Sequence, residues 1–161
     1  MASHPQTAHR FIGPPGWLEY ADWRGGPGTV IGRVLVRPDV ASARLGNWRH
    51  VLVHVPPSLD GAEAGAPGRS YPVLYVHDGQ NAFDEGTSAH GEWQLDETLQ
   101  LVADEGIEAI VVAVPNAEAA RPRGAQRRPD EYSPYRDGGV GGNAEEYLSL
   151  LADVVKPLVD A

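Results

Sequence analysis

The chain has 161 residues, enough for one domain with a sizeable core, and 42% of them are hydrophobic. Its formal net charge of −9 offers no basic stripe for a phosphate backbone, which argues against a nucleic-acid partner. The sequence contains no Cys, so disulfides, thiolate catalysis and cysteine-ligated metals are excluded.

The N-terminus lacks a cationic stretch followed by an apolar one, and no apolar run approaches the ~18 residues of a membrane span. We therefore expect a cytoplasmic protein without a membrane partner. The densest run of basic residues lies among prolines and acids, and we expect it to be a solvated loop. It consists of Arg121, Arg123, Arg127 and Arg128.

Residues 1–29 are rich in Pro, Gly and Trp and show no sustained period, so we expect an irregular lead-in. Its aromatic residues are expected to pack on a larger body: Trp17, Tyr20 and Trp23. Alternating apolar residues then predict strands over 30–37 and 49–55, followed by a Gly/Ala/Pro-rich loop over 58–70.

Two later runs, 72–77 and 109–114, are almost continuously apolar and β-branched, as in central strands of a parallel sheet that are buried on both faces. Between them, apolar residues at helical spacing predict a helix over 92–104, with Gly106 at its C-terminal end. Strand, helix and strand together predict a βαβ unit.

The last predicted element is a helix over 144–160, with Asn143 and Glu146 as a capping pair and Pro157 as a kink or early stop. In alternating α/β folds a parallel strand normally follows such a helix. We therefore predict an incomplete α/β sheet of about four strands, the first two antiparallel and the later ones parallel, with an open edge. A small self-sufficient α/β domain is the alternative, and a nucleotide-type α/β domain is less favoured.

Open α/β sheets bind ligands at the carboxyl ends of their strands, and these ends carry recognisable sequence here. Five segments, in this order, resemble motifs of one esterase family: 71–84 (YPVLYVHDGQNAFD), 91–96 (GEWQLD), 111–116 (VVAVPN), 131–135 (EYSPY) and 142–160. The family belongs to the α/β-hydrolase superfamily. It includes enterochelin-type esterases and is related to feruloyl esterases and mycolyltransferases.

The resemblance implies that residues 30–161 are the N-terminal half of a serine esterase domain acting on a small or glycosylated ester. Such a domain would carry a G-x-S-x-G nucleophile elbow on the next strand, followed by an acid and a histidine. The segments 86–90 and 68–72 begin like an elbow but lack its second glycine. Nucleophile, acid and base are therefore absent from the sequence, and we expect the chain alone to be inactive.

The family pattern implies that the backbone N–H of Gln80 is a donor of the oxyanion hole, and that Gly79 lets the backbone turn tightly enough to aim it. A plain β-turn made by Asp78 and Gly79 is the alternative. For His77 and Asp78 we favour roles in shaping this loop over a proton relay, because no nucleophile is within reach.

Four polar or aromatic residues are candidates for contact with substrate: Trp93, Tyr132, Tyr135 and Asn116. Trp93 is equally compatible with a core position. His90 and Glu92 are close in sequence but form no recognised metal motif, and Gly138–Gly142 lacks the ending of a phosphate loop, so no metal or cofactor is expected.

Two functions thus remain open. The first is one half of a serine ester hydrolase, whose partner is a small-molecule ester once the remainder is supplied. The second is a non-catalytic binding module that pairs, with itself or with a complementing chain, through its open sheet edge.

Overall fold

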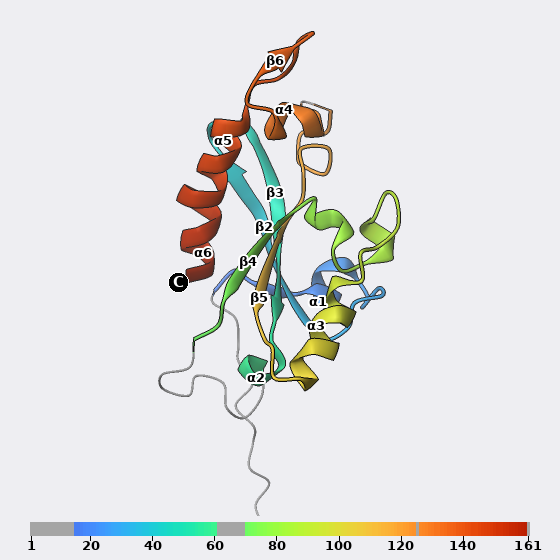
Figure 1. The fold of residues 1–161 in the computed structure, drawn as a ribbon. Helices are drawn as coiled ribbons and strands as arrows, with labels where there is room; N and C mark the ends of the chain where they lie inside the picture. The colour runs from blue at the N-terminus through green and yellow to red at the C-terminus, as the bar shows by residue number, and fades with distance from the viewer. Residues whose placement is uncertain (1–14, 61–69, 125, 161) are drawn as a thin grey trace, which may run out of the picture.

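The computed structural model of the chain describes residues 15–60, 70–124 and 126–160 (Figure 1). Its helices are α1 (Tyr20–Arg24), α2 (Pro57–Asp60), α3 (Leu95–Asp104), α4 (Arg128–Tyr132), α5 (Ala144–Ser149) and α6 (Lys156–Asp160). A π-helical segment, Leu150–Val155, joins the last two, and the short 3₁₀ helices are Gly79–Asn81 and Glu85–Thr87. The strands are β1 (Leu18–Glu19), β2 (Arg33–Ser42), β3 (Asn47–Val55), β4 (Val73–His77), β5 (Ile110–Val114), β6 (Arg136–Asp137) and β7 (Val140–Gly141).

The main sheet has five strands in the order β1-β2-β3-β5-β4, and β6 and β7 form a separate hairpin. Neighbours are antiparallel except β4 and β5, which run parallel around α3 and form the predicted βαβ unit. The α/β class is confirmed. The strand count is one higher than expected, because β1 lies in the segment predicted to be irregular.

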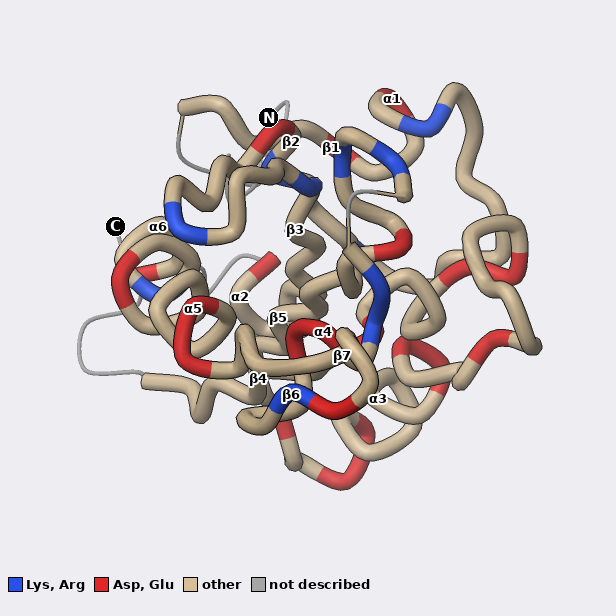
Figure 2. Tube along the Cα trace, turned by 90° about the horizontal axis from the view of Figure 1, so that it is seen from above, with Lys and Arg blue, Asp and Glu red and all other residues tan. Residues whose placement is uncertain are grey.

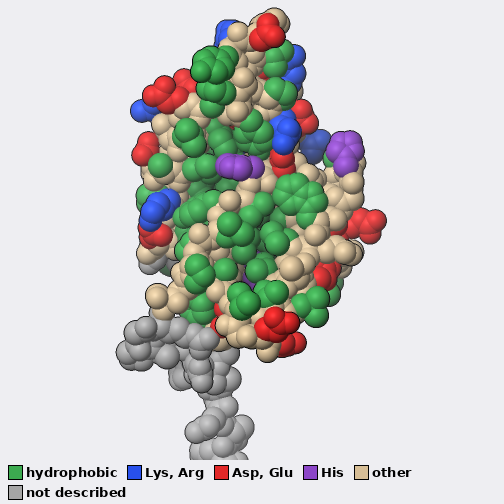
Figure 3. All heavy atoms as spheres, in the orientation of Figure 1, with side chains coloured by type: hydrophobic (Ala, Val, Ile, Leu, Met, Phe, Trp, Pro, Cys, Tyr) green, Lys and Arg blue, Asp and Glu red, His purple; other side chains and the backbone are tan. Residues whose placement is uncertain are grey.

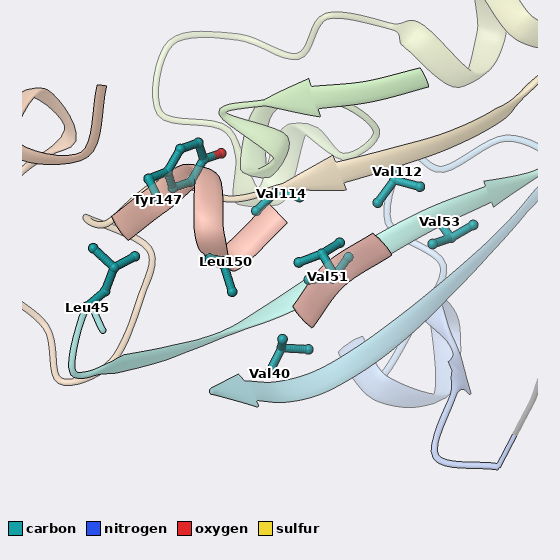
Figure 4. Packing of buried hydrophobic residues seen from close by; sticks show 9 residues of the cluster. Val40, Leu45, Val51, Val53, Val112, Val114, Tyr147 and Leu150 are labelled. Atoms are coloured by element: carbon teal, nitrogen blue, oxygen red, sulfur yellow. The ribbon is translucent and has the colours of Figure 1, made fainter. Parts of the chain in front are cut away.

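Helices cover both faces of this sheet, with α5 and α6 on one side and α1 and α3 on the other (Figure 1). Alternation along the strands divides the core accordingly. Val51 and Val53 of β3 pack with Tyr147 and Leu150 on the first side (Figure 4), whereas Leu52 lies in the second cluster, with Phe83. The two-residue period of the strands thus builds two cores from one sheet.

The lead-in is more ordered than its sequence indicates, from residue 15 onward; its first fourteen residues lie outside the described part. Its aromatic residues pack as predicted: Trp17 contacts the first cluster, and Tyr20 and Trp23 the second. The hydroxyl of Tyr20, a residue only 3% exposed, donates a hydrogen bond to Asp84 in the loop after β4. Burial and the Asp84 carboxylate together raise the pKa of Tyr20.

β5 is buried as predicted, but β4 is not. Val111 to Val114 are fully buried, because β5 has β3 on one side and β4 on the other. Within the described residues β4 pairs only with β5, and Val73 and Leu74 are 40% and 51% exposed. Hydrophobic side chains gather on the face that presents β4 (Figure 3). The open sheet edge expected from the sequence is therefore β4.

The C-terminal helix continues to Asp160, so Pro157 does not end it. The helix becomes π-helical over Leu150–Val155, just ahead of the proline. Proline has no N–H to donate and its ring crowds the preceding turn, and a π-helical turn accommodates such a break in the hydrogen-bond ladder. Asn143 is the N-cap, but its side chain makes no capping bond, so the predicted capping pair with Glu146 is wrong.

Acidic segments outnumber basic ones along the chain, and Lys and Arg are scattered among them (Figure 2). None of the described helices has the length and apolarity that crossing a membrane requires.

Burial lowers the pKa of two histidines, His50 and His54, and each makes stability depend on pH. His54 of β3 is 1% exposed and neither ring nitrogen has a partner among the described residues. Burial lowers its pKa to about 4. Since the unfolded chain binds this proton near pH 6.5, the free energy of unfolding should fall by about 3 kcal/mol as the pH drops from about 6.5 to 4. Urea unfolding of wild type and His54→Leu over this range measures the effect.

His90→Gln, a change at an exposed histidine, is the matched control. His54→Leu should lose the part of the pH dependence that comes from His54 and keep the part that comes from His50, whose pKa is also lowered to about 4, and His90→Gln should keep both parts. Equal slopes for His54→Leu and wild type would contradict the assignment.

Candidate functional site

The parallel strands β4 and β5 end side by side, and the segments that leave them are bonded to each other. The side-chain amide of Asn116 donates to Asp78 Oδ1 at 2.8 Å, and the backbone N–H of Asn116 donates to Gln80 Oε1 at 3.1 Å. Asn116 Oδ1 in turn accepts the N–H of Glu118 at 2.9 Å. The sheet thus brings together residues 36 to 38 apart in sequence at its carboxyl edge.

A sharp turn follows β4. Asp78 adopts the left-handed conformation, with φ 53° and ψ 37°, which costs energy in a non-glycine residue and must be held by its surroundings. Gly79 then passes against β5, where a Cβ atom would lie 2.4 Å from the carbonyl carbon of Ala113. Only glycine fits here because of this close backbone approach.

Gln80 occupies the middle of the short 3₁₀ helix Gly79–Asn81. Its side chain is held by Asn116, and its carbonyl accepts the hydroxyl of Thr87 at 2.7 Å. Its own N–H has no hydrogen-bond acceptor anywhere in the described part of the chain. A fixed peptide group with an unused N–H at the end of a strand is the kind of donor that an oxyanion hole requires.

Asp78 holds the turn through several donors. The guanidinium of Arg128 forms a bidentate pair with its carboxylate, with N–O distances of 2.6 to 2.8 Å, and Asn116 donates as described. Burial alone would raise the pKa of Asp78, but these hydrogen bonds outweigh it and the pKa is lowered. Asp78 therefore stays ionised and holds the loop through these bonds.

His77 joins an aromatic cluster with Tyr132 and Tyr147. Its Nδ1 lies 2.9 Å from the hydroxyl of Tyr147, and the two tyrosine rings meet edge to face at 5.2 Å. Tyr132 also accepts the backbone N–H of Asp78 at 3.2 Å, while burial raises its pKa to about 12. His77 thus bonds to a side chain rather than to a local backbone group.

The helix α4, which carries Tyr132, is fixed to the sheet by a buried ion pair. Arg49 of β3 contacts both carboxylate oxygens of Glu131, and both side chains are completely buried. Arg49 also donates to the carbonyl of Pro115 at 2.9 Å and to Asn47 Oδ1 at 2.8 Å. This pair was not foreseen from sequence, although the 131–135 motif pointed to the segment.

The remaining predicted residues lie differently. Trp93 is 50% exposed, so its ring does not fill a core position. Its backbone N–H donates to the carbonyl of Asn81 at 2.9 Å. Tyr135 is 81% exposed, whereas Asn116 is buried and its polar side-chain atoms are bonded within the protein. Arg128 was predicted to lie in a solvated loop. It is half exposed, but its charge is paired with Asp78, because the fold brings α4 to the end of β4.

The buried ion pair yields a stability prediction. Glu131→Gln leaves Arg49 charged and without its partner in a fully buried position, which should cost about 3–5 kcal/mol of unfolding free energy. Denaturant unfolding measures it. Lys156→Gln is the control: it removes one partner of the exposed Lys156–Asp160 pair and should leave the midpoint of unfolding nearly unchanged. Equal effects of the two changes would contradict the interpretation.

Comparison with known proteins agrees with this geometry. No curated protein sequence matches the chain significantly. A solved IroE-like serine hydrolase from Shewanella oneidensis shares the fold with a TM-score of 0.53 and 16% identity, over 78% of this chain and 37% of the other. The BES protein from Bacillus cereus gives a TM-score of 0.50 and 17% identity, over 94% of this chain and 48% of the other.

The chain therefore spans less than half the length of either similar structure, and at these identities the likeness concerns the fold. The sequence profile of the family described as "Putative esterase" matches residues 42–161, about three quarters of the chain. On this match, the chain belongs to the "Putative esterase" family.

Proposed function

We propose that this chain supplies one half of the active site of a serine carboxylic-ester hydrolase. Gln80 would provide a backbone donor to the oxyanion, and the nucleophile, acid and base would come from residues outside this sequence. The observation that carries the proposal is the unbonded N–H of Gln80 at the carboxyl edge of the sheet. Family membership and the fold it shares with a serine hydrolase support the reaction class.

The donor's surroundings suit the chemistry of ester hydrolysis. When a nucleophile attacks an ester carbonyl, negative charge develops on the carbonyl oxygen, and preorganised N–H groups stabilise it without reorganising. Asp78 holds the turn from one side and Asn116 holds the Gln80 side chain from the other. The donor would therefore already be in position before substrate arrives.

Two aromatic residues lie beside this loop, the half-exposed Trp93 and the partly buried Tyr132. Trp93 is bonded through its backbone to Asn81, one residue past the proposed donor, and half of its side chain is exposed. Tyr132 contacts the backbone of Asp78. We propose both as walls of the acyl or alcohol pocket.

A non-catalytic binding module is the second candidate, and the open β4 edge is the observation that favours it. Among the described residues, the outer edge of β4 has no strand beside it, and Val73 and Leu74 are exposed. This edge offers main-chain hydrogen bonds and apolar contact to an added strand, from a second copy or a complementing chain.

The two candidates differ in what complementation restores. The chain alone should not be labelled by a fluorophosphonate probe, because its sequence contains no G-x-S-x-G elbow. Nucleotides downstream of codon 161 should encode such an elbow, in frame or shifted, and co-expression with that segment should produce labelling and hydrolysis of p-nitrophenyl acetate. Labelling of the chain alone would contradict the proposal. A stable dimer in light scattering, with no elbow encoded downstream, would favour the binding module.

The role of Gln80 can be tested by removing its N–H. In the complemented enzyme Gln80→Pro deletes the donor, whereas Gln80→Ala deletes only the side chain and is the matched control. Relative to Gln80→Ala, Gln80→Pro should lower kcat by about 10²–10³, the usual effect of losing one oxyanion donor. Equal kcat values in the two variants, both folded by circular dichroism, would rule out Gln80 as the donor.

A further inference from the structure

Three carboxylates lie together at the N-terminal end of α3, apart from the residues of the proposed active site. Glu92, Asp96 and Glu97 each offer one oxygen, and these atoms lie within 4.8 Å of one another. Like charges at such separations repel strongly unless a proton or a cation lies between them.

Each of these three residues has one buried carboxylate oxygen without a hydrogen-bond partner among the described residues. Asp96 is 0% exposed; its Oδ2 accepts the N–H of Ile31 at 2.6 Å, but its Oδ1 has no hydrogen-bond partner in the described structure. Glu92 Oε1 and Glu97 Oε2 are likewise buried atoms without a partner. Buried polar atoms are nearly always satisfied, so three unsatisfied carboxylate oxygens at one place point to a missing positive partner.

The part of the chain that the structure describes provides no such partner. Among the described residues, no Lys or Arg forms an ion pair with Glu92, Asp96 or Glu97. The surrounding groups therefore do not stabilise the carboxylate charges sufficiently by themselves.

We propose that Glu92, Asp96 and Glu97 bind a calcium ion. Oxygen-only ligands favour a hard divalent cation, since zinc sites usually include His or Cys. Oxygens up to 4.8 Å apart can share an ion with bonds of about 2.4 Å, the usual Ca–O length. Mg²⁺ requires near-ideal octahedral geometry and gives up its waters reluctantly, whereas Ca²⁺ accepts irregular sets of carboxylate oxygens. Water would complete the coordination.

Calcium bound here would join three segments of the fold. Thr29 donates its hydroxyl to Glu92 Oε2 at 2.7 Å, and Ile31 donates its N–H to Asp96, so the segment before β2 already contacts two of the ligands. Trp93, next to Glu92, is bonded to the loop after β4 through Asn81. The ion would fix the entrance of α3 against both. None of its ligands is in the loop that carries Gln80, so the inference stands apart from the proposed esterase activity.

The test uses the full chain, stripped with EDTA. Calorimetric titration should give binding of one Ca²⁺ with a Kd of about 10⁻⁵–10⁻³ M, and Ca²⁺ at about 100 times Kd should raise Tm by about 5 °C. Tb³⁺ should show luminescence on tryptophan excitation, through neighbouring Trp93, and Ca²⁺ should displace it.

Variants locate the site. Glu97→Gln and Glu92→Gln each remove one charged ligand and should weaken Ca²⁺ binding at least tenfold. Glu105→Gln, at an exposed glutamate just past the same helix, should bind like wild type. No binding to folded wild type at millimolar Ca²⁺, binding of Mg²⁺ alone, or unchanged affinity in both ligand variants would overturn the proposal. So would a Tm that rises in Glu97→Gln while wild type ignores Ca²⁺, because the carboxylates would then share a proton.

Discussion

The carboxylate of Asp78 joins the separate segments from which the candidate site is built. It ends the turn after β4, accepts the amide of Asn116 from the end of β5, and pairs with Arg128 from α4. Each contact compensates for the strain of a non-glycine residue at positive φ. Without this anion the turn that leads into Gln80 would lose its bonds to the Asn116 amide and to Arg128. The geometry of the proposed donor therefore depends on a side chain two positions away.

A second anion, Glu131, supports the position of Asp78 indirectly. Glu131 is held by Arg49 of β3, and this buried pair fixes the helix from which Arg128 and Tyr132 reach Asp78. The site is therefore built from charges paired within the fold. The acidic net charge of the chain is distributed elsewhere, on exposed segments and at the cluster that includes Asp96.

Much of the fold was predictable from the period of its apolar residues. The strands over 72–77 and 109–114 and the helix between them were foreseen within a few residues, because the two strands are runs of β-branched apolar residues and the helix has apolar residues at helical spacing. β1 was not, since two residues carry no period and pair only because β2 lies beside them. The loop after β4 was found by its motif, but neither the pairing of Arg128 with Asp78 nor that of Arg49 with Glu131 could be foreseen. Their contacts join residues 82 and 50 apart, and no local pattern encodes them.

Because the proposed donor at position 80 is a main-chain N–H, its chemistry does not depend on which amino acid occupies the position. Every residue except proline brings the same N–H, so hydrolysis itself would place little selective pressure on the glutamine. What the side chain does contribute is its bond to Asn116, which fixes where that N–H lies. On the proposed role, substitutions at this position would change the position of the N–H only gradually, and an alanine scan would not detect the N–H proposed to act on the substrate.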